Sequence, residues 1–177
     1  MNDNEIKTFL TESIDIVFDK DIYLLKNDLS ERAITHRLAV CMEDKFKGFN
    51  IDCEYNGHAD SAHRKIIKLL REKVRAIGLL QKDDGENEIL SRYVFPDIIV
   101  HKRGPNNFGA NLLIVEVKKT TSKIKEDYDI EKLSRYTSLE YENDLAYSLG
   151  VFILFIIDKN EPSYQLRFFK DGKEINL

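Results

Sequence analysis

Apolar residues recur along this chain at two different spacings, which together predict a mixture of helices and strands. Over residues 4–19 they recur every three or four positions, as they do on the buried face of a helix. The same spacing predicts a second helix over residues 29–46, which Asp28 could cap. Further helices are expected over residues 66–77, where the polar face is basic, and over residues 126–138.

Other segments show the short apolar runs and the two-residue alternation that are typical of β-strands. These runs cover residues 49–55, 94–100, 112–118, 151–157, 165–169 and 174–176. The run at 151–157 has no polar alternation, so it is expected to be a central strand that is buried on both faces. The last two runs flank Asp171-Gly172, a dipeptide that favours a tight hairpin turn.

The order of these elements predicts an α/β fold in which helices cover both faces of a mixed β-sheet. A chain of 177 residues suits a single domain. We expect N-terminal helices within residues 1–47 and a core over residues 48–177. A helical insertion is expected at about residues 60–82 of that core.

The composition is that of a globular protein, with 42% hydrophobic and 33% charged residues. No apolar run reaches the length needed to span a membrane, and the polar, acidic N-terminus does not resemble a secretion signal. We therefore expect a cytoplasmic location. Cys41 and Cys53 lack the spacing of a metal site, so both are expected to be reduced residues of the core.

The net charge of −4 argues against a nucleic-acid partner, but the charge is unevenly distributed. Residues 62–82 contain seven basic residues and one acidic residue. Within this stretch Arg64, Lys68 and Arg71 are candidate contacts for nucleic acid. The alternative is that the stretch is the solvated face of a helix.

Two of the predicted strands carry charge where a buried strand should be apolar. Asp97 lies in the first, and Glu116 and Lys118 lie in the second. Charged side chains in such runs are costly unless they pair with each other or bind a metal. Because side chains on a strand alternate between faces, Glu116 and Lys118 point the same way.

The loop between these strands is rich in turn-forming residues and predicts a hairpin. If the turn centres on Asn106-Asn107, Asp97 lies directly opposite Glu116 on the same face of the sheet, although a one-residue bulge would break this register. Two carboxylates so placed repel each other, and a Mg²⁺ ion between them would relieve the repulsion. His101 would share this face and could border the site.

Two more acidic positions have competing interpretations. Glu31 lies on the inward stripe of its helix, so a third carboxylate could face the core. However, residues 28–31 also match a capping box, in which Glu31 would bond the Asp28 amide. Lys132 follows Asp129 by one helical turn, and this pair could join the site, contact nucleic acid through Lys132, or form a surface ion pair.

Taken together, these residues resemble the PD-(D/E)XK nuclease superfamily, the group with the restriction-endonuclease-like fold. The signature here is Pro96-Asp97, eighteen intervening residues, and Glu116-Val117-Lys118. The resemblance covers roughly residues 29–158, from the helix with Glu31 to the predicted central strand. Short segments are also similar to a group of bacterial members without an assigned activity, namely residues 54–56, 96–101 and 116–119.

The resemblance implies Mg²⁺-dependent hydrolysis of phosphodiester bonds, with DNA as the expected substrate. Asp97, Glu116 and the carbonyl of Val117 would hold Mg²⁺, for which Mn²⁺ is expected to substitute. Glu31 would bind a second metal or an outer-sphere water. Lys118 would orient the attacking water or stabilise charge on the phosphate. Since an ammonium beside two acids stays protonated, Lys118 is a poor general base.

Two alternatives remain open at this stage. The first is a catalytically silent module on the same fold that binds nucleic acid or a protein. The second is a subunit whose grip on the substrate comes from another chain, as a homodimer or with a partner subunit. Metal binding distinguishes the enzyme from the silent module.

Overall fold

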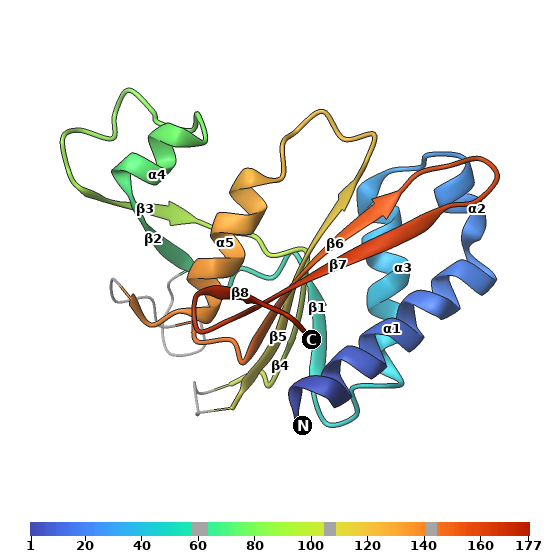
Figure 1. Ribbon diagram of the computed structural model, residues 1–177. Coiled ribbons are helices and arrows are strands. Elements are labelled where there is room, and N and C mark those ends of the chain that lie inside the picture. The colour runs from blue at the N-terminus through green and yellow to red at the C-terminus, as the bar shows by residue number, and fades with distance from the viewer. Residues whose placement is uncertain (58–63, 105–108, 141–144) are drawn as a thin grey trace.

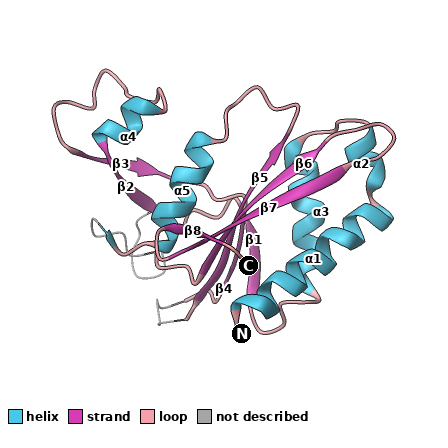
Figure 2. Cartoon of the chain, viewed as in Figure 1, coloured by secondary structure: helices cyan, strands magenta, loops and turns pink. Residues whose placement is uncertain are grey.

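The computed structural model describes residues 1–57, 64–104, 109–140 and 145–177, and Figure 2 shows their secondary structure. The helices in these ranges are α1 (Asp3–Lys20), α2 (Ile22–Lys26), α3 (Glu31–Glu43), α4 (Arg71–Ala76) and α5 (Asp127–Thr137). The strands are β1 (Asn50–Cys53), β2 (Ile66–Leu70), β3 (Ile89–Tyr93), β4 (Ile98–His101), β5 (Asn111–Lys119), β6 (Leu149–Ile156), β7 (Ser163–Lys170) and β8 (Lys173–Ile175).

The main sheet has six strands in the order β1-β4-β5-β6-β7-β8. Strands β5 and β6 are parallel and are joined through α5, whereas every other neighbouring pair in this sheet is antiparallel. A second sheet consists of β2 and β3. The predicted mixed α/β class is therefore confirmed.

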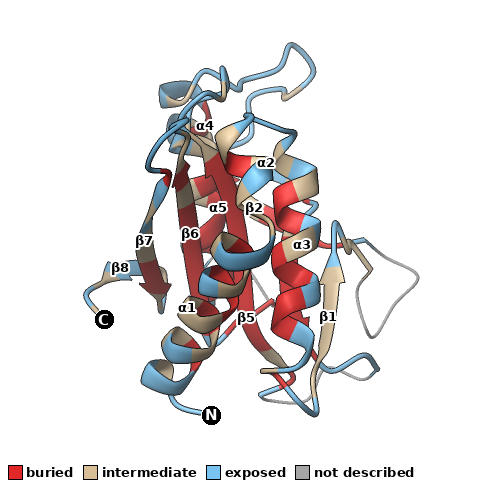
Figure 3. Cartoon of the chain, turned by 90° about the vertical axis from the view of Figure 1, so that its right-hand side faces the viewer, coloured by how far each residue is buried: buried red, intermediate tan, exposed pale blue. Residues whose placement is uncertain are grey.

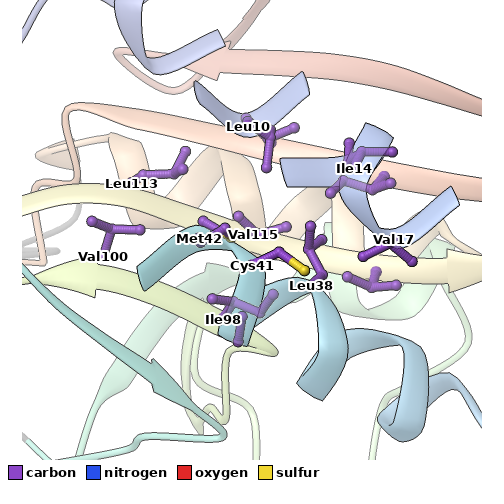
Figure 4. Close-up of a cluster of buried hydrophobic side chains, with 14 of the residues drawn as sticks. Leu10, Ile14, Val17, Leu38, Cys41, Met42, Ile98, Val100, Leu113 and Val115 are labelled. Atoms are coloured by element: carbon purple, nitrogen blue, oxygen red, sulfur yellow. The ribbon is translucent and has the colours of Figure 1, made fainter. Parts of the chain in front are cut away.

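Helices cover both faces of the main sheet (Figure 1). Helices α1 and α3 pack on one face, and α5 packs on the other together with the small β2–β3 sheet. Figure 4 shows the first of these interfaces, where apolar side chains of α1, α3, β4 and β5 meet. The labelled residues are Leu10, Ile14, Val17, Leu38, Cys41, Met42, Ile98, Val100, Leu113 and Val115.

The centre of the sheet is formed by β5 and β6, which are buried over most of their length. Residues 112–118 of β5 are all buried, and β6 is buried over residues 149–153, as the absence of polar alternation predicted (Figure 3). Gly150 allows α5 to lie close to β6, since a Cβ there would sit 3.1 Å from Thr137 Cγ2. This close approach brings the inward face of α5 over the middle of β5 and β6.

The predicted helical insertion at residues 60–82 is wrong in its first half. Residues 66–70 form strand β2, whose partner β3 lies about twenty residues later in the chain, and only residues 71–76 are helical. The spacing of Ile66 and Leu70 imitated a helix, but cross-strand pairing with β3 determines the conformation. Residues 58–63 lie outside the described residues.

Two details also differ from the predictions, namely the cap of α3 and the exposure of Cys53 in β1. Helix α3 is capped by the Ser30 hydroxyl, which accepts from the Ala33 amide, and not by Asp28. Cys41 is buried as predicted, whereas Cys53 is exposed at the end of β1; both thiols are free.

Among the described residues, no helix is long and apolar enough to cross a membrane.

Candidate metal and catalytic site

The pairing of β4 with β5 has the register that the sequence predicted. Ile98 pairs with Val115 and Val100 pairs with Leu113, so the same register, continued by one residue, places Asp97 opposite Glu116. A bulge does occur, but it lies between Val100 and His101, beyond the paired residues that set this register. The predicted turn centre at residues 106–107 lies outside the described residues.

Asp97 ends the β4–β5 ladder with its side chain. Its Oδ2 accepts the backbone N–H of Val117 at 2.7 Å, because β4 begins only at Ile98 and offers no carbonyl there. In an antiparallel strand the N–H and C=O of one residue point to the same side. The Val117 carbonyl therefore faces the same edge as Asp97.

Glu116 is only 1% exposed and is paired with a lysine from α5. Lys132 Nζ lies 2.6 Å from Glu116 Oε2 and 2.9 Å from Asp129 Oδ1. Asp129 Oδ2 in turn lies 2.8 Å from Lys118 Nζ. These four side chains therefore form a buried chain of alternating charge, in which Glu116 and Lys118 share one face of β5 as predicted.

The helical period of α5 explains why Asp129 and Lys132 point inward. They lie three residues apart, on the same side of the helix as buried Leu133 and Tyr136. The surface ion pair that was considered for them is wrong, since both side chains are buried against β5. Lys132, a candidate contact for nucleic acid, thus lies in the interior with Glu116 and Asp129 as partners.

Glu31 reaches the same end of β5 from the start of α3. Its Oε2 accepts the backbone N–H of Lys119 at 3.1 Å, and its Oε1 lies 3.9 Å from Lys118 Nζ. The capping-box alternative is wrong, because the carboxylate bonds β5 and the cap is Ser30. Asp97 and Glu31 thus each satisfy one N–H of β5 beyond the end of β4.

Burial raises the pKa of Asp97, which precedes β4, and of Glu116, which lies in β5. It raises the pKa of Asp97 from 3.8 to about 6, although the Val117 N–H opposes the shift. It raises the pKa of Glu116 from 4.5 to about 8, with Lys132 opposing the shift and Asp97 adding to it. The effect of Asp97 on Glu116 is the repulsion that the predicted register implied.

Burial acts on the pKa of the two lysines in the opposite direction, because it disfavours their charged form. Burial is the largest single effect on Lys118 and Lys132 and lowers the pKa of each. For Lys118 the contact of its ammonium with the Asp129 carboxylate, together with nearby acids, outweighs burial, and for Lys132 the charges of Glu116 and Asp129 do so. The pKa of each lysine is therefore raised, and both remain ammonium ions at neutral pH.

A cavity of about 390 Å³ opens beside Asp97 and Glu31, between the start of α3 and the end of β1. Its lining residues are Glu31, Arg32, Thr35, His36, Cys53, Glu54 and Asp97. Glu54 is paired with Arg32 at 2.8 Å. Asp97 and Glu31 therefore face an open space, whereas Glu116 lies buried and outside the lining of this cavity.

The donor chemistry of the site suits a hard divalent cation. Glu31, Asp97, Glu116 and Asp129 set four carboxyl groups against the two ammonium groups of Lys118 and Lys132, so two negative charges are in excess when all four are ionised, which for Glu116 requires a pH above about 8. Glu116 Oε1 is buried without a hydrogen bond among the described residues. Oxygen donors with surplus negative charge are what Mg²⁺ prefers.

The side chains are not arranged as a closed metal cage. Within the described part of the chain, no three His, Cys, Asp or Glu side chains are grouped so that they could hold a metal ion. Asp97 and Glu116 are engaged with Val117 and Lys132 instead. A cation would therefore have to use the remaining oxygen donors or displace these partners.

The other predicted residues lie away from this cluster. Arg64 is exposed, Lys68 lies on β2, and Arg71 begins α4 and donates to the carbonyls of Asp84 and Asn87. The structure does not bring these three residues to the acidic site.

His101 belongs to a separate cluster that the sequence reasoning missed. Its Nε2 lies 2.8 Å from Asp52 Oδ2, and Arg103 pairs with the same carboxylate. The three residues come from β1, from the end of β4 and from the loop that follows it. The antiparallel pairing of Asn50 with His101 brings them together, and no sequence motif signals it.

Comparisons of the chain with models of protein families, with curated proteins and with solved structures found no match. The resemblance to a nuclease superfamily therefore rests on the motif residues alone.

The raised acid pKa values predict that stability falls as the pH rises. Between pH 4.5 and about 8 the folded protein holds a proton on Glu116 that the unfolded chain has lost. The stabilisation that this proton gives the folded state therefore decreases through that window and is gone above it. Each unit of pKa difference corresponds to about 1.4 kcal/mol. Urea unfolding at pH 5 and pH 8 should therefore show a smaller loss of stability in Glu116→Gln than in wild type. Equal losses in the two proteins would contradict this assignment.

Proposed function

We propose that this protein is a Mg²⁺-dependent nuclease of the PD-(D/E)XK superfamily that hydrolyses phosphodiester bonds in DNA. The observation that carries the proposal is the convergence of Asp97, Glu116 and Lys118 on one face at one end of the sheet. The register that opposes Asp97 and Glu116 is the one expected for a turn centred on residues 106–107. A cavity in front of Asp97 offers an approach for substrate.

The order of elements supports the restriction-endonuclease-like fold. Helix α3 with Glu31 is followed by β1, β4, β5, α5 and β6, which is the order that the resemblance implied over residues 29–158. The β2–β3 sheet and α4 form an insertion between β1 and β4. The site lies at the carboxyl end of the parallel strand β5, where open α/β sheets generally bind their ligands.

Asp97, Glu116 and the Val117 carbonyl would hold Mg²⁺ in this proposal, and Mn²⁺ would substitute. When bound, the cation would neutralise the phosphate and lower the pKa of a bound water. Lys118, kept protonated by Asp129, would stabilise charge on the phosphate and orient the water. Glu31, which faces the same cavity, would bind an outer-sphere water or a second ion.

A second function is favoured by one specific observation. Glu116 is almost fully buried and already has a cationic partner in Lys132, as a degenerate site without metal would have. The rival proposal is therefore a silent module on this fold that binds nucleic acid or a protein. Such a module needs no divalent cation.

One pair of experiments separates the two proposals. Purified protein is incubated with single- and double-stranded DNA and with RNA, in Mg²⁺, in Mn²⁺ and in a chelator, and Mn²⁺ binding is measured by calorimetry on wild type and Glu116→Ala. The nuclease proposal expects cation-dependent cleavage and Mn²⁺ binding that the substitution weakens. Absence of both cleavage and Mn²⁺ binding in wild type would overturn it in favour of the binding module.

A further inference from the structure

The buried ammonium of Lys132 lies where it can control the charge of the proposed metal site. Its Nζ lies 2.6 Å from Glu116 Oε2 and 2.9 Å from Asp129 Oδ1, and the residue is 8% exposed. The motif residues Asp97, Glu116 and Lys118 do not by themselves assign Lys132 a role in cation binding. This ion pair places a positive charge directly against the Glu116 carboxylate.

Asp129 divides its two oxygens between the two lysines. Its Oδ1 pairs with Lys132 and its Oδ2 lies 2.8 Å from Lys118. Asp129 thereby fixes both ammonium groups on the α5 side of the site. If Lys132 gave up Glu116, it would keep a carboxylate partner and would not be left as an unpaired buried charge.

Glu116 uses its two oxygens unequally. Oε2 is bonded to Lys132, whereas Oε1 is buried without a hydrogen bond among the described residues. Lys132 thus fixes the orientation of the carboxylate and leaves one oxygen for another partner. The Tyr136 hydroxyl also has no hydrogen bond of good geometry in the same set of residues; burial, and after it the charge of Glu116, raises its pKa.

We infer that Lys132 is a resident cation that orients Glu116 and sets the affinity of the site for a divalent metal, with Asp129 as its anchor. This inference rests on the proposed function and assigns both α5 residues as positioning residues for metal binding. Lys132 adds a positive charge that repels the incoming ion, and Asp129 adds a negative charge that attracts it. The two residues therefore have opposite effects on affinity.

The test compares Mg²⁺ binding, without nucleic acid, in four full-length proteins by calorimetry and by thermal unfolding at pH 8.5. Lys132→Gln removes a positive charge and should tighten binding about tenfold, whereas Asp129→Asn should weaken it about tenfold. The double variant restores the charge balance and should bind within about threefold of wild type. The rise in midpoint temperature on adding Mg²⁺ should follow the same order.

If Asp129 and Lys132 have a purely structural role, these substitutions should change stability and not Mg²⁺ affinity. Both single variants would then lower the midpoint temperature while leaving the Mg²⁺ affinity equal to that of wild type, and this result would overturn the inference. If Lys132→Gln fails to fold, Asp129→Asn alone decides, since unchanged or tighter binding contradicts the anchor role. Binding by Lys132→Gln but not by wild type would support the inference.

Failure of the proposed function gives a different pattern. In that case neither wild type nor any variant binds Mg²⁺, and both the nuclease proposal and this inference are overturned. Wild type that binds Mg²⁺ with an affinity that is insensitive to both α5 substitutions overturns only the inference.

Discussion

Asp97→Asn should reduce Mg²⁺-dependent cleavage of DNA by about 10³-fold and leave the fold intact. A metal ligand contributes several kcal/mol to the stabilisation of the transition state, and about 1.4 kcal/mol corresponds to a factor of ten in rate. The asparagine can still accept the Val117 N–H that Asp97 accepts now, so the end of the β4–β5 ladder is preserved. Steady-state cleavage and circular dichroism of both proteins provide the measurement.

The matched control is Asp19→Asn, which makes the same chemical change at an exposed position of α1. It should cleave at the wild-type rate. Cleavage by Asp97→Asn at the wild-type rate would remove Asp97 from the site and with it the proposed metal ligation. Because burial raises the pKa of Asp97 to about 6, the neutral asparagine should leave stability unchanged or slightly increased at pH 8.

Lys132→Met should lower the free energy of unfolding by about 3 kcal/mol. The substitution leaves Glu116 without its cation at 1% exposure, and removal of one partner of a buried ion pair is strongly destabilising. Lys118 and Asp129 still pair, so the loss is confined to the Glu116 end of the network. Urea unfolding at pH 8 measures the effect.

The double substitution Glu116→Leu with Lys132→Met tests the cause of that loss. Replacing both members of a buried ion pair by apolar residues of similar size is often neutral or stabilising. The double variant should therefore recover most of the stability lost in Lys132→Met. A double variant no more stable than Lys132→Met would show that the loss comes from packing on α5 and not from the unpaired charge.

Much of the fold followed from local patterns. The spacing of apolar residues predicted α1 and α5 to within two residues, and the unbroken apolar run predicted β6 as a central strand. These elements were predictable because their buried faces are long and regular. The 66–70 segment was not, since its strand conformation depends on a partner about twenty residues away.

The candidate site shows the same division. Asp97, Glu116 and Lys118 could be found because charge in a buried strand is costly and therefore informative. The register of β4 with β5 followed from the alternation of side chains and the position of the turn residues. Asp129 and Lys132 were recognised only as an ordinary helical pair, because the three-residue spacing is equally typical of an exposed ion pair.

The sequence by itself determined which acids and which lysine share a face of the central strand, since strand periodicity and hairpin register are local properties. Tertiary structure alone decided that α5 places Lys132 against Glu116 and that Glu31 bonds the Lys119 amide. Both contacts join segments whose relative position depends on packing over the whole sheet. The charge balance of the site, and hence its affinity for a cation, is a property of that packing.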